Sequence, residues 1–216
     1  MNRRILSILA VVTGLLLLSV HHLGHSFGDD LFRWAGIAPW TNPEANSGAH
    51  LPAIVGIILL VLGIVGVSHL YRERDPKVKS RVILGCIAFM MVFPFASEGG
   101  MFLLKSNASG LSSVSYAKKD SRCSYRTEDG KVLAECWLNI YNYGKEQQVT
   151  IRPLDTQVGD SVIAYESKSV TVQPRRQNRA FVVFEGDAKP ALDSYHGMRQ
   201  EPGMEIEVGG RSKQIQ

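Results

Sequence analysis

Three apolar runs dominate the first half of the chain. They are Ile5–Val20, Leu51–Leu70 and a run that begins at Val82 and continues to Ala96. An α-helix rises about 1.5 Å per residue, so about 20 apolar residues cross the hydrocarbon core of a bilayer. We therefore predict three transmembrane helices, at about 5–23, 51–71 and 82–104.

The first and third runs need their neighbours to reach this length. The first has sixteen residues, which rise about 24 Å, so residues 21–23 would have to extend the helix. The third reaches full length only if Glu98 lies near the far interface and Met101–Leu104 complete the span. Its Pro94 is tolerated, because membrane helices accommodate proline.

From Lys105 onward the pattern changes to a period of two, which is typical of half-buried strands. Turn residues separate the apolar stretches at intervals of about ten residues. We expect strands near 113–118, 148–153, 161–166, 169–173, 180–185 and 204–208, besides a hairpin near 123–140. Seven or eight short strands favour a β-sandwich, with an open barrel as the alternative.

The hairpin also predicts a disulfide. Asp129-Gly130 is a favoured two-residue type I′ turn. If it forms the turn, position i pairs with 259 − i, so Cys123 lies opposite Cys136. Alternation makes this a non-hydrogen-bonded pair with Cα atoms about 4.5 Å apart, within the range of disulfides. Such a bond requires an oxidising compartment. Cys86 has no partner, and we interpret it as a packing residue.

Positive charges set the expected orientation. Arg3 and Arg4 precede the first run, and the link 72–81 carries five Lys and Arg residues, whereas the loop 24–50 carries only Arg33. Cytoplasmic segments of membrane proteins are enriched in Lys and Arg. We expect a multi-pass plasma-membrane protein with a cytoplasmic N-terminus and link. Residues 1–104 form its membrane domain and 105–216 its extracytoplasmic domain.

Two features of the membrane domain have alternatives. The first run has the layout of a secretory signal, but no A-x-A pattern of small residues follows it, so we favour an uncleaved anchor. Gly56 and Gly63 share one helix face, with Gly66 close by. Small residues let membrane helices approach closely. We favour packing within the chain over a dimerisation surface.

Composition excludes several classes. The chain has 216 residues, 45% of them hydrophobic, with three cysteines. A disordered chain would have a lower share of hydrophobic residues, and a disulfide-dense mini-protein would be shorter and richer in cysteine. The segment from Lys105 holds 16 basic and 14 acidic residues, a net charge of +2. The topology and this balance argue against nucleic acid as a partner and favour membrane lipid and other membrane or envelope proteins.

Part of the second half resembles a known fold. The segment 136–153, Cys-Trp-Leu-Asn-Ile-Tyr-Asn-Tyr-Gly-Lys followed by a returning strand, is similar to bacterial extracytoplasmic immunoglobulin-like modules. The stretch Ser-Val-Thr-Val-Gln-Pro, residues 169–174, and the apolar strand after it also fit such modules. The resemblance covers residues 111–208 and implies an immunoglobulin-like sandwich with a structural or interaction role. It carries over no functional residue.

Histidines and aspartates at the end of the first predicted helix and in the outer loop suggest metal chemistry. His21 and His25 lie four apart and would share a face if the first helix continued. His22 adjoins them, and Asp29, its neighbour Asp30 or His50 would supply a third ligand. Such a set suits zinc or copper. The alternative is that these residues cap helices at the membrane interface beside an aromatic belt.

Two further groups are candidates for binding. Glu98 is the only acidic residue of the third apolar segment, and an ionisable group at membrane depth is a functional hypothesis by default. An interfacial role is the alternative. Arg175, Arg176 and Arg179 crowd one turn and would contact an anion, unless they are a solvated turn.

No catalytic motif is present in the sequence. It lacks G-x-S-x-G, H-E-x-x-H, the P-loop and the Rossmann glycine pattern. We therefore expect a non-enzymatic protein that displays a β-sandwich as a binding or assembly module. The alternatives are a metal- or ion-handling membrane protein that uses the outer-loop histidines, and a sensor or regulator that acts through a partner protein.

Overall fold

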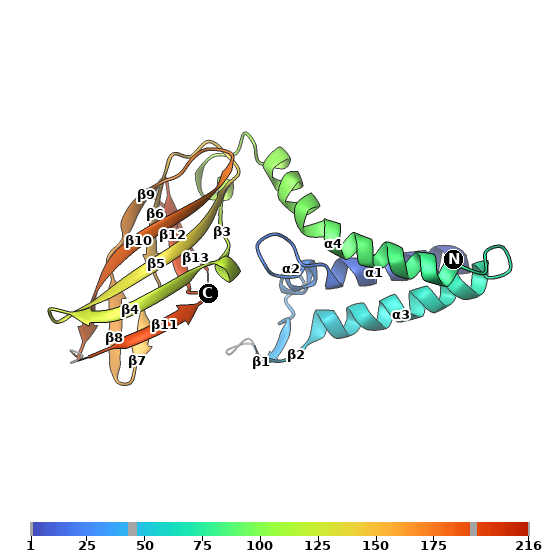
Figure 1. The fold of residues 1–216 in the computed structure, drawn as a ribbon, viewed down its shortest axis with the longest axis horizontal. Helices are drawn as coiled ribbons and strands as arrows, with labels where there is room; N and C mark the ends of the chain where they lie inside the picture. Colours follow the sequence, from blue (N-terminus) through green and yellow to red (C-terminus); the bar gives the residue numbers. More distant parts are fainter. Residues whose placement is uncertain (1, 43–46, 191–193, 216) are drawn as a thin grey trace. The chain divides into compact units, whose positions relative to one another are not determined.

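The structure is a computed structural model that describes residues 2–42, 47–190 and 194–215. The chain folds into two compact units, Met1–Glu98 and Gly99–Gln216. The first unit is helical apart from one short hairpin, and the second consists mainly of antiparallel strands (Figure 1).

The helical elements follow the apolar runs. They are α1 (Arg3–Leu18), α2 (Phe27–Trp34), α3 (Leu51–Tyr71) and α4 (Val78–Leu104), with a hairpin of β1 (Trp40–Asn42) and β2 (Ser47–His50) before α3. Helix α3 has the predicted bounds. Helix α4 begins four residues before the predicted start, so that its first turn includes charged residues of the link, and it contains Pro94.

The prediction that the first helix reaches residue 23 is wrong. Helix α1 ends at Leu18, and Ser19 caps it in an extended conformation. The Ser19 hydroxyl donates to the Leu15 carbonyl at 2.7 Å, and the Phe27 N–H donates to the Ser19 carbonyl at 3.0 Å. These bonds turn the chain back. Sixteen helical residues rise about 24 Å, which is less than the hydrocarbon core.

Two helices of the described chain, and not three, are therefore long and apolar enough to cross a membrane. They are α3 and α4. Many of their apolar side chains are exposed, among them Leu62 (62%), Met91 (69%) and Phe95 (75%).

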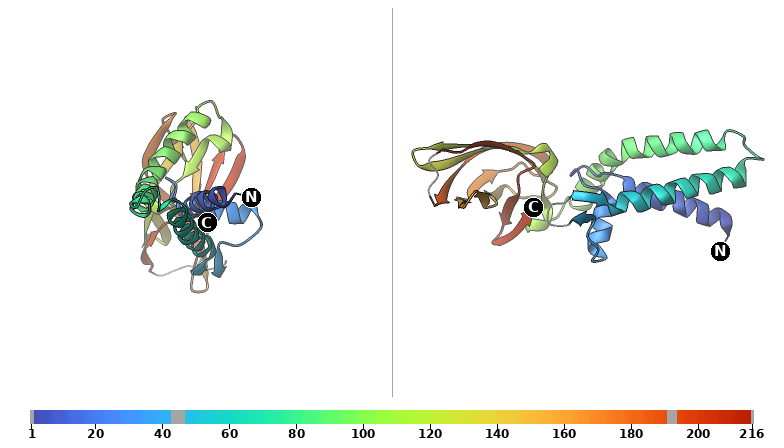
Figure 2. Two further views of the ribbon diagram at one scale, coloured as in Figure 1. Left: turned by 90° about the vertical axis from the view of Figure 1, so that its right-hand side faces the viewer. Right: turned by 90° about the horizontal axis from the view of Figure 1, so that it is seen from below.

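Glycines let α1 and α3 pack closely (Figure 2). A Cβ atom at Gly63 would lie 2.6 Å from the Val11 nitrogen, and one at Gly56 would lie 2.9 Å from Leu18 Cγ. A Cβ at Gly14, on the facing helix, would lie 2.7 Å from the Leu60 nitrogen. The glycines of α3 thus serve packing within the chain, as we favoured.

The second unit contains two antiparallel sheets and two 3₁₀ turns, η1 (Gly110–Ser113) and η2 (Lys118–Asp120). The larger sheet has the order β11-β4-β5-β10-β8-β7, with β3 also paired to β5, and the smaller has the order β13-β12-β6-β9. The strands are β3 (Val114–Tyr116), β4 (Arg122–Glu128), β5 (Lys131–Asn142), β6 (Gln148–Pro153), β7 (Thr156–Val158), β8 (Ser161–Tyr165), β9 (Lys168–Thr171), β10 (Arg176–Lys189), β11 (His196–Gln200), β12 (Met204–Val208) and β13 (Arg211–Ile215).

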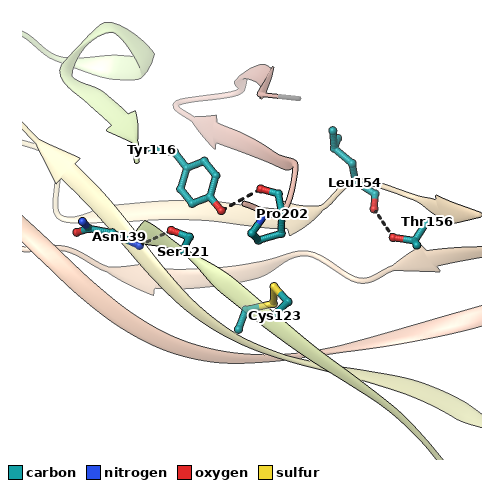
Figure 3. Close-up of a disulfide and its surroundings, with 8 residues drawn as sticks. Tyr116, Ser121, Cys123, Asn139, Leu154, Thr156 and Pro202 are labelled. Carbon is teal, nitrogen blue, oxygen red and sulfur yellow. Dashed lines mark hydrogen bonds between the residues drawn. A yellow bond between two sulfur atoms is a disulfide. The ribbon is translucent and has the colours of Figure 1, made fainter. Parts of the chain in front are cut away.

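The predicted hairpin forms in the predicted register. Strands β4 and β5 pair from Arg122 opposite Trp137 to Glu128 opposite Lys131, and Asp129 and Gly130 both have positive φ, at 51° and 77°, as a type I′ turn requires. The Cys123–Cys136 disulfide is confirmed, with Cα atoms 4.1 Å apart (Figure 3).

One apolar core lies between the two sheets. Strand β5 alternates buried and more exposed residues up to Trp137, so its Val132, Ala134 and Cys136 face the core. The smaller sheet contributes Val149, Ile151, Met204, Ile206 and Val208. The unit is therefore sandwich-like, with the disulfide buried in its core and the opposite face of the larger sheet turned outward.

Candidate functional site

The outward face of the larger sheet carries exposed apolar side chains. Trp137 on β5 is 52% exposed and Phe181 on β10 is 51% exposed. Val183, two residues after Phe181 and therefore on the same face, is 38% exposed. We call these three residues the apolar patch. Their neighbours Cys136 and Phe184 are completely buried, so strict alternation fixes the patch on the outside.

The strand register brings the patch together. Phe181 lies directly opposite Trp137 in the β5–β10 ladder, and the two ring centroids are 4.8 Å apart at an interplanar angle of 45°. Figure 1 shows β5 and β10 side by side in the middle of the larger sheet. Strand β4 pairs with β5 at Trp137, so the two rings project from the paired strands of the sheet and not from a loop.

Two arginines flank the patch. Arg122 lies opposite Trp137 on β4, and Arg179 precedes Phe181 by two residues on the same face of β10. Both are exposed. Within the described ranges, no carboxylate forms an ion pair with either guanidinium.

Two cations farther along the same face form ion pairs. Arg126 contacts Glu128 and Glu135 at 3.3 and 3.0 Å, and Lys131 contacts Glu185 at 2.8 Å. Near the β4–β5 turn, the positive charges of Arg126 and Lys131 are therefore balanced by glutamates of the same face. Beside the two aromatic rings, the face keeps the positive charge of its arginines. Aromatic residues and arginine are among the residue types that most often contribute the largest share of the binding energy in protein–protein interfaces.

This site was not predicted from the sequence. Trp137 lies in the predicted hairpin, but the sequence does not show which strand pairs with the far side of that hairpin. The pairing of β5 with β10 joins residues 44 positions apart, Trp137 and Phe181. The sequence does hold one signal of this site. Phe181 and Val183 are two residues apart in a strand and therefore share a face, and Val182 and Phe184 on the other face are also apolar, so one apolar face of this strand has to lie outside the core.

The histidine cluster exists, but a turn builds it and not a helix. His21 and His25 face each other with ring centroids 3.8 Å apart. Their Nε2 atoms lie 3.4 Å from two different oxygens of Asp30. The prediction that a continuing helix would align the histidines is wrong, because α1 ends before them.

The other two predicted ligands lie in different contacts. The Nδ1 atom of His22 is 3.2 Å from the Ser97 hydroxyl. Asp29 accepts a hydrogen bond from the Ser26 N–H at 3.2 Å, in a capping box at the start of α2. Its other oxygen lies 2.5 Å from Nε2 of His50. The structure therefore groups His21 and His25 with Asp30.

Glu98 and the three arginines are the remaining predicted site residues. Glu98 is half-buried, and no ion pair joins it to Arg33 or a histidine in the part of the chain that the structure describes. Arg175 donates through Nε to the Ser106 carbonyl at 3.2 Å, and Arg176 donates to the Gln173 side chain at 3.3 Å. Arg179 instead belongs to the sheet face described above.

Comparisons with protein-family models, with curated proteins and with solved structures give no match. The geometry of the chain's own residues is therefore the basis for any functional interpretation.

Proposed function

We propose that the chain is an integral membrane protein that displays the two sheets of its second unit, which we call the β-domain, outside the membrane as a binding module for a partner protein. The observation that carries this proposal is the apolar patch. Two aromatic rings are exposed side by side on the sheet, bordered by arginines that form no ion pair within the described ranges. An exposed apolar patch of this kind is typical of a surface that another molecule covers.

The membrane part of the proposal rests on α3 and α4. Their exposed apolar side chains suit lipid, and the basic residues gather in the short link between them. The excess of Lys and Arg favours a cytoplasmic link, which would place the β-domain outside. The disulfide suits that compartment. The resemblance of residues 111–208 to extracytoplasmic immunoglobulin-like modules supports the same display role.

The surroundings of the patch define the partner chemistry. Arg122 and Arg179 would pair with carboxylates, while Trp137 and Phe181 would pack against an apolar side chain. We therefore expect an acidic segment of a membrane or envelope protein, with Asp or Glu on both sides of an apolar residue. The charges would speed encounter and fix orientation, and the rings would supply most of the affinity.

Site-specific photo-crosslinking in cells tests this proposal. A photoreactive phenylalanine analogue replaces Phe181, and the matched control places it at Gln214, which is exposed on β13 of the smaller sheet. We expect position 181, but not 214, to give a defined adduct whose crosslinked peptide is acidic. Trp137→Ala should reduce the adduct about 30-fold, as loss of about 2 kcal/mol implies.

A charge swap distinguishes a true interface from chance proximity. Arg122→Glu with Arg179→Glu should abolish the adduct, and changing the partner's carboxylates to Lys should restore it. Equal adducts from positions 181 and 214, or adducts with lipid alone, would show that the patch is not a protein-binding surface.

A further inference from the structure

The turn between α1 and α2 gathers two imidazoles and one carboxylate. One ligand atom from each of His21, His25 and Asp30 lies within 4.8 Å of the other two. We propose that these three residues bind a divalent transition-metal ion such as Zn²⁺. The site is distinct from the apolar patch, so neither proposal depends on the other.

Backbone bonds position the ligands before any ion arrives. The His21 N–H donates to the His25 carbonyl at 3.0 Å, and Val20 bridges to Ser26. Gly24, with a φ of +93°, allows the tight reversal between them. The capping box of Ser26 and Asp29 then fixes the first turn of α2, which carries Asp30. A preformed turn lowers the ordering cost of binding.

The spacing between each histidine nitrogen and the Asp30 carboxylate suits a tetrahedral ion. Zn²⁺ binds histidine nitrogen and carboxylate oxygen at about 2.1 Å, so two ligand atoms at a tetrahedral angle are about 3.4 Å apart. Nε2 of His21 lies 3.4 Å from Oδ2 of Asp30, and Nε2 of His25 lies 3.4 Å from Oδ1, so each nitrogen has this spacing from one of the two carboxylate oxygens. This is longer than a good hydrogen bond.

Solvent reaches the cluster from one side. The Asp30 side chain is 50% exposed and that of His25 is 38% exposed, whereas His21 is 12% exposed and forms the inner wall. Two histidines and one carboxylate leave the fourth position of a zinc ion open for water or a further ligand. The three residues therefore suit a zinc site that keeps one position for an exchangeable ligand, and not a structural site with four protein ligands.

One hydrogen bond opposes binding. The Leu23 N–H donates to Nδ1 of His21 at 3.1 Å. A neutral imidazole that ligates through Nε2 carries its proton on Nδ1, so this bond has to open when the ion binds. Binding therefore costs His21 its hydrogen bond from the Leu23 N–H, and the bond from Nε2 to the metal ion has to compensate for this loss.

The chain supplies matched controls beside the site. His22 is adjacent to His21 but contacts Ser97, and His50 contacts Asp29 rather than Asp30. If the three residues bind the ion, replacing His22 should leave affinity unchanged within about twofold. Loss of a residue that only supports a metal-binding side chain lowers metal affinity about 10–100-fold. Loss of a metal-binding side chain itself should therefore lower the affinity at least tenfold.

The test is calorimetric titration of the full-length, chelator-treated protein in lipid nanodiscs with ZnCl₂, followed by CuCl₂. We expect one zinc ion per chain in the unchanged protein. Affinity should fall at least tenfold in Asp30→Asn and in His25→Ala, and should persist in His22→Ala. Cobalt(II) absorbance provides a second readout, because a tetrahedral site gives visible bands that the Asp30→Asn protein should lack.

Three results would overturn the proposal. They are no heat with ZnCl₂ at millimolar concentration, an unchanged affinity in Asp30→Asn, and an equal loss in His22→Ala and His25→Ala. Far-ultraviolet circular dichroism of each variant establishes that α1 and α2 still form. If His25→Ala unfolds, Asp30→Asn with the cobalt bands decides the question, because the exposed Asp30 lies outside the capping box.

Discussion

At the residue scale, Gly186 allows a close approach inside the larger sheet. A Cβ atom there would lie 2.7 Å from Cδ1 of Tyr165 and 2.8 Å from Cγ2 of Ile163. Both side chains belong to the core, so they cannot move aside freely. We expect Gly186→Ala to lower the free energy of unfolding by about 1–3 kcal/mol, measured from the urea midpoint of the intact protein.

Gly197 is the matched control for this substitution. It also lies in a strand, but the nearest atoms that a Cβ there would meet belong to the Tyr195 side chain, with the hydroxyl oxygen at 3.3 Å. Gly197→Ala should change the urea midpoint little. An equal effect of the two substitutions would mean that backbone freedom, and not the contact with Tyr165 and Ile163, is what matters at Gly186.

Tyr116 couples the stability of the β-domain to alkaline pH. Its hydroxyl donates to the Pro202 carbonyl at 3.0 Å in a buried position (Figure 3). Burial raises the pKa of Tyr116 well above its usual range. The unfolded chain has a tyrosine pKa of about 10. The stabilising contribution is therefore complete below about pH 10 and is lost as the pH rises further.

Tyr116→Phe tests this pH dependence. At neutral pH the substitution should cost about 1–2 kcal/mol, because the Pro202 carbonyl loses its donor. Between pH 9 and 12 the variant should lose less stability than the unchanged protein, by urea unfolding at each pH. Parallel curves for the two proteins would assign the alkaline loss to Tyr125 and Tyr165, whose pKa values burial also raises.

At the scale of single elements, the hairpin of β4 and β5 is closed by the disulfide. Cys123 and Cys136 are separated by 13 positions, and closing a loop of this size contributes about 3 kcal/mol in the chain-entropy model. Replacing both cysteines by serine should lower the unfolding free energy of the β-domain by about that amount. Urea unfolding of the intact protein measures it.

Cys86 is the control for this experiment. It is buried in α4 and unpaired, so Cys86→Ser should leave the β-domain transition unchanged. A reducing agent should shift that transition in the unchanged protein and in Cys86→Ser, but not in the double variant. If the reducing agent has no effect on the unchanged protein, the hairpin gains its stability from its turn and register alone.

The helix pair α1 and α3 depends on the absence of side chains at its glycines. A Cβ at Gly63 would lie 2.6 Å from the backbone nitrogen of Val11, and backbone atoms cannot move without separating the helices. We expect Gly63→Leu to lower the thermal midpoint of the helical unit in detergent. Gly85→Leu is the control, because a Cβ at Gly85 meets nothing within 4 Å.

At the scale of the whole molecule, the proposed topology makes a prediction about compartments. Alkaline phosphatase is active only after export to an oxidising compartment. A fusion after Ile215 should be active, since the β-domain is expected outside. A fusion after Arg74, in the basic link, should be inactive because positive segments stay in the cytoplasm. The reverse pattern would place the β-domain inside and remove its proposed role in display.

The sequence by itself determined the features that depend on neighbouring residues. The bounds of α3 follow from a continuous apolar run, and the β4–β5 register with its disulfide follows from Asp129-Gly130. In both cases the information is local: a helix closes its own hydrogen bonds, and a two-residue turn fixes every pair that follows it. Strands β6 and β12 also lie at their predicted bounds.

Only the tertiary structure decided the rest, because contacts between distant segments leave no local pattern. The end of α1 at Leu18 depends on the return of the chain to Phe27. The choice of Asp30 over Asp29 depends on how α2 is capped and on His50, 21 positions away. The pairing of Trp137 with Phe181 depends on which strand joins β5. Both candidate sites are formed by contacts between residues that the fold brings together. The residue types could therefore be read from the sequence, but the residues that they contact could not.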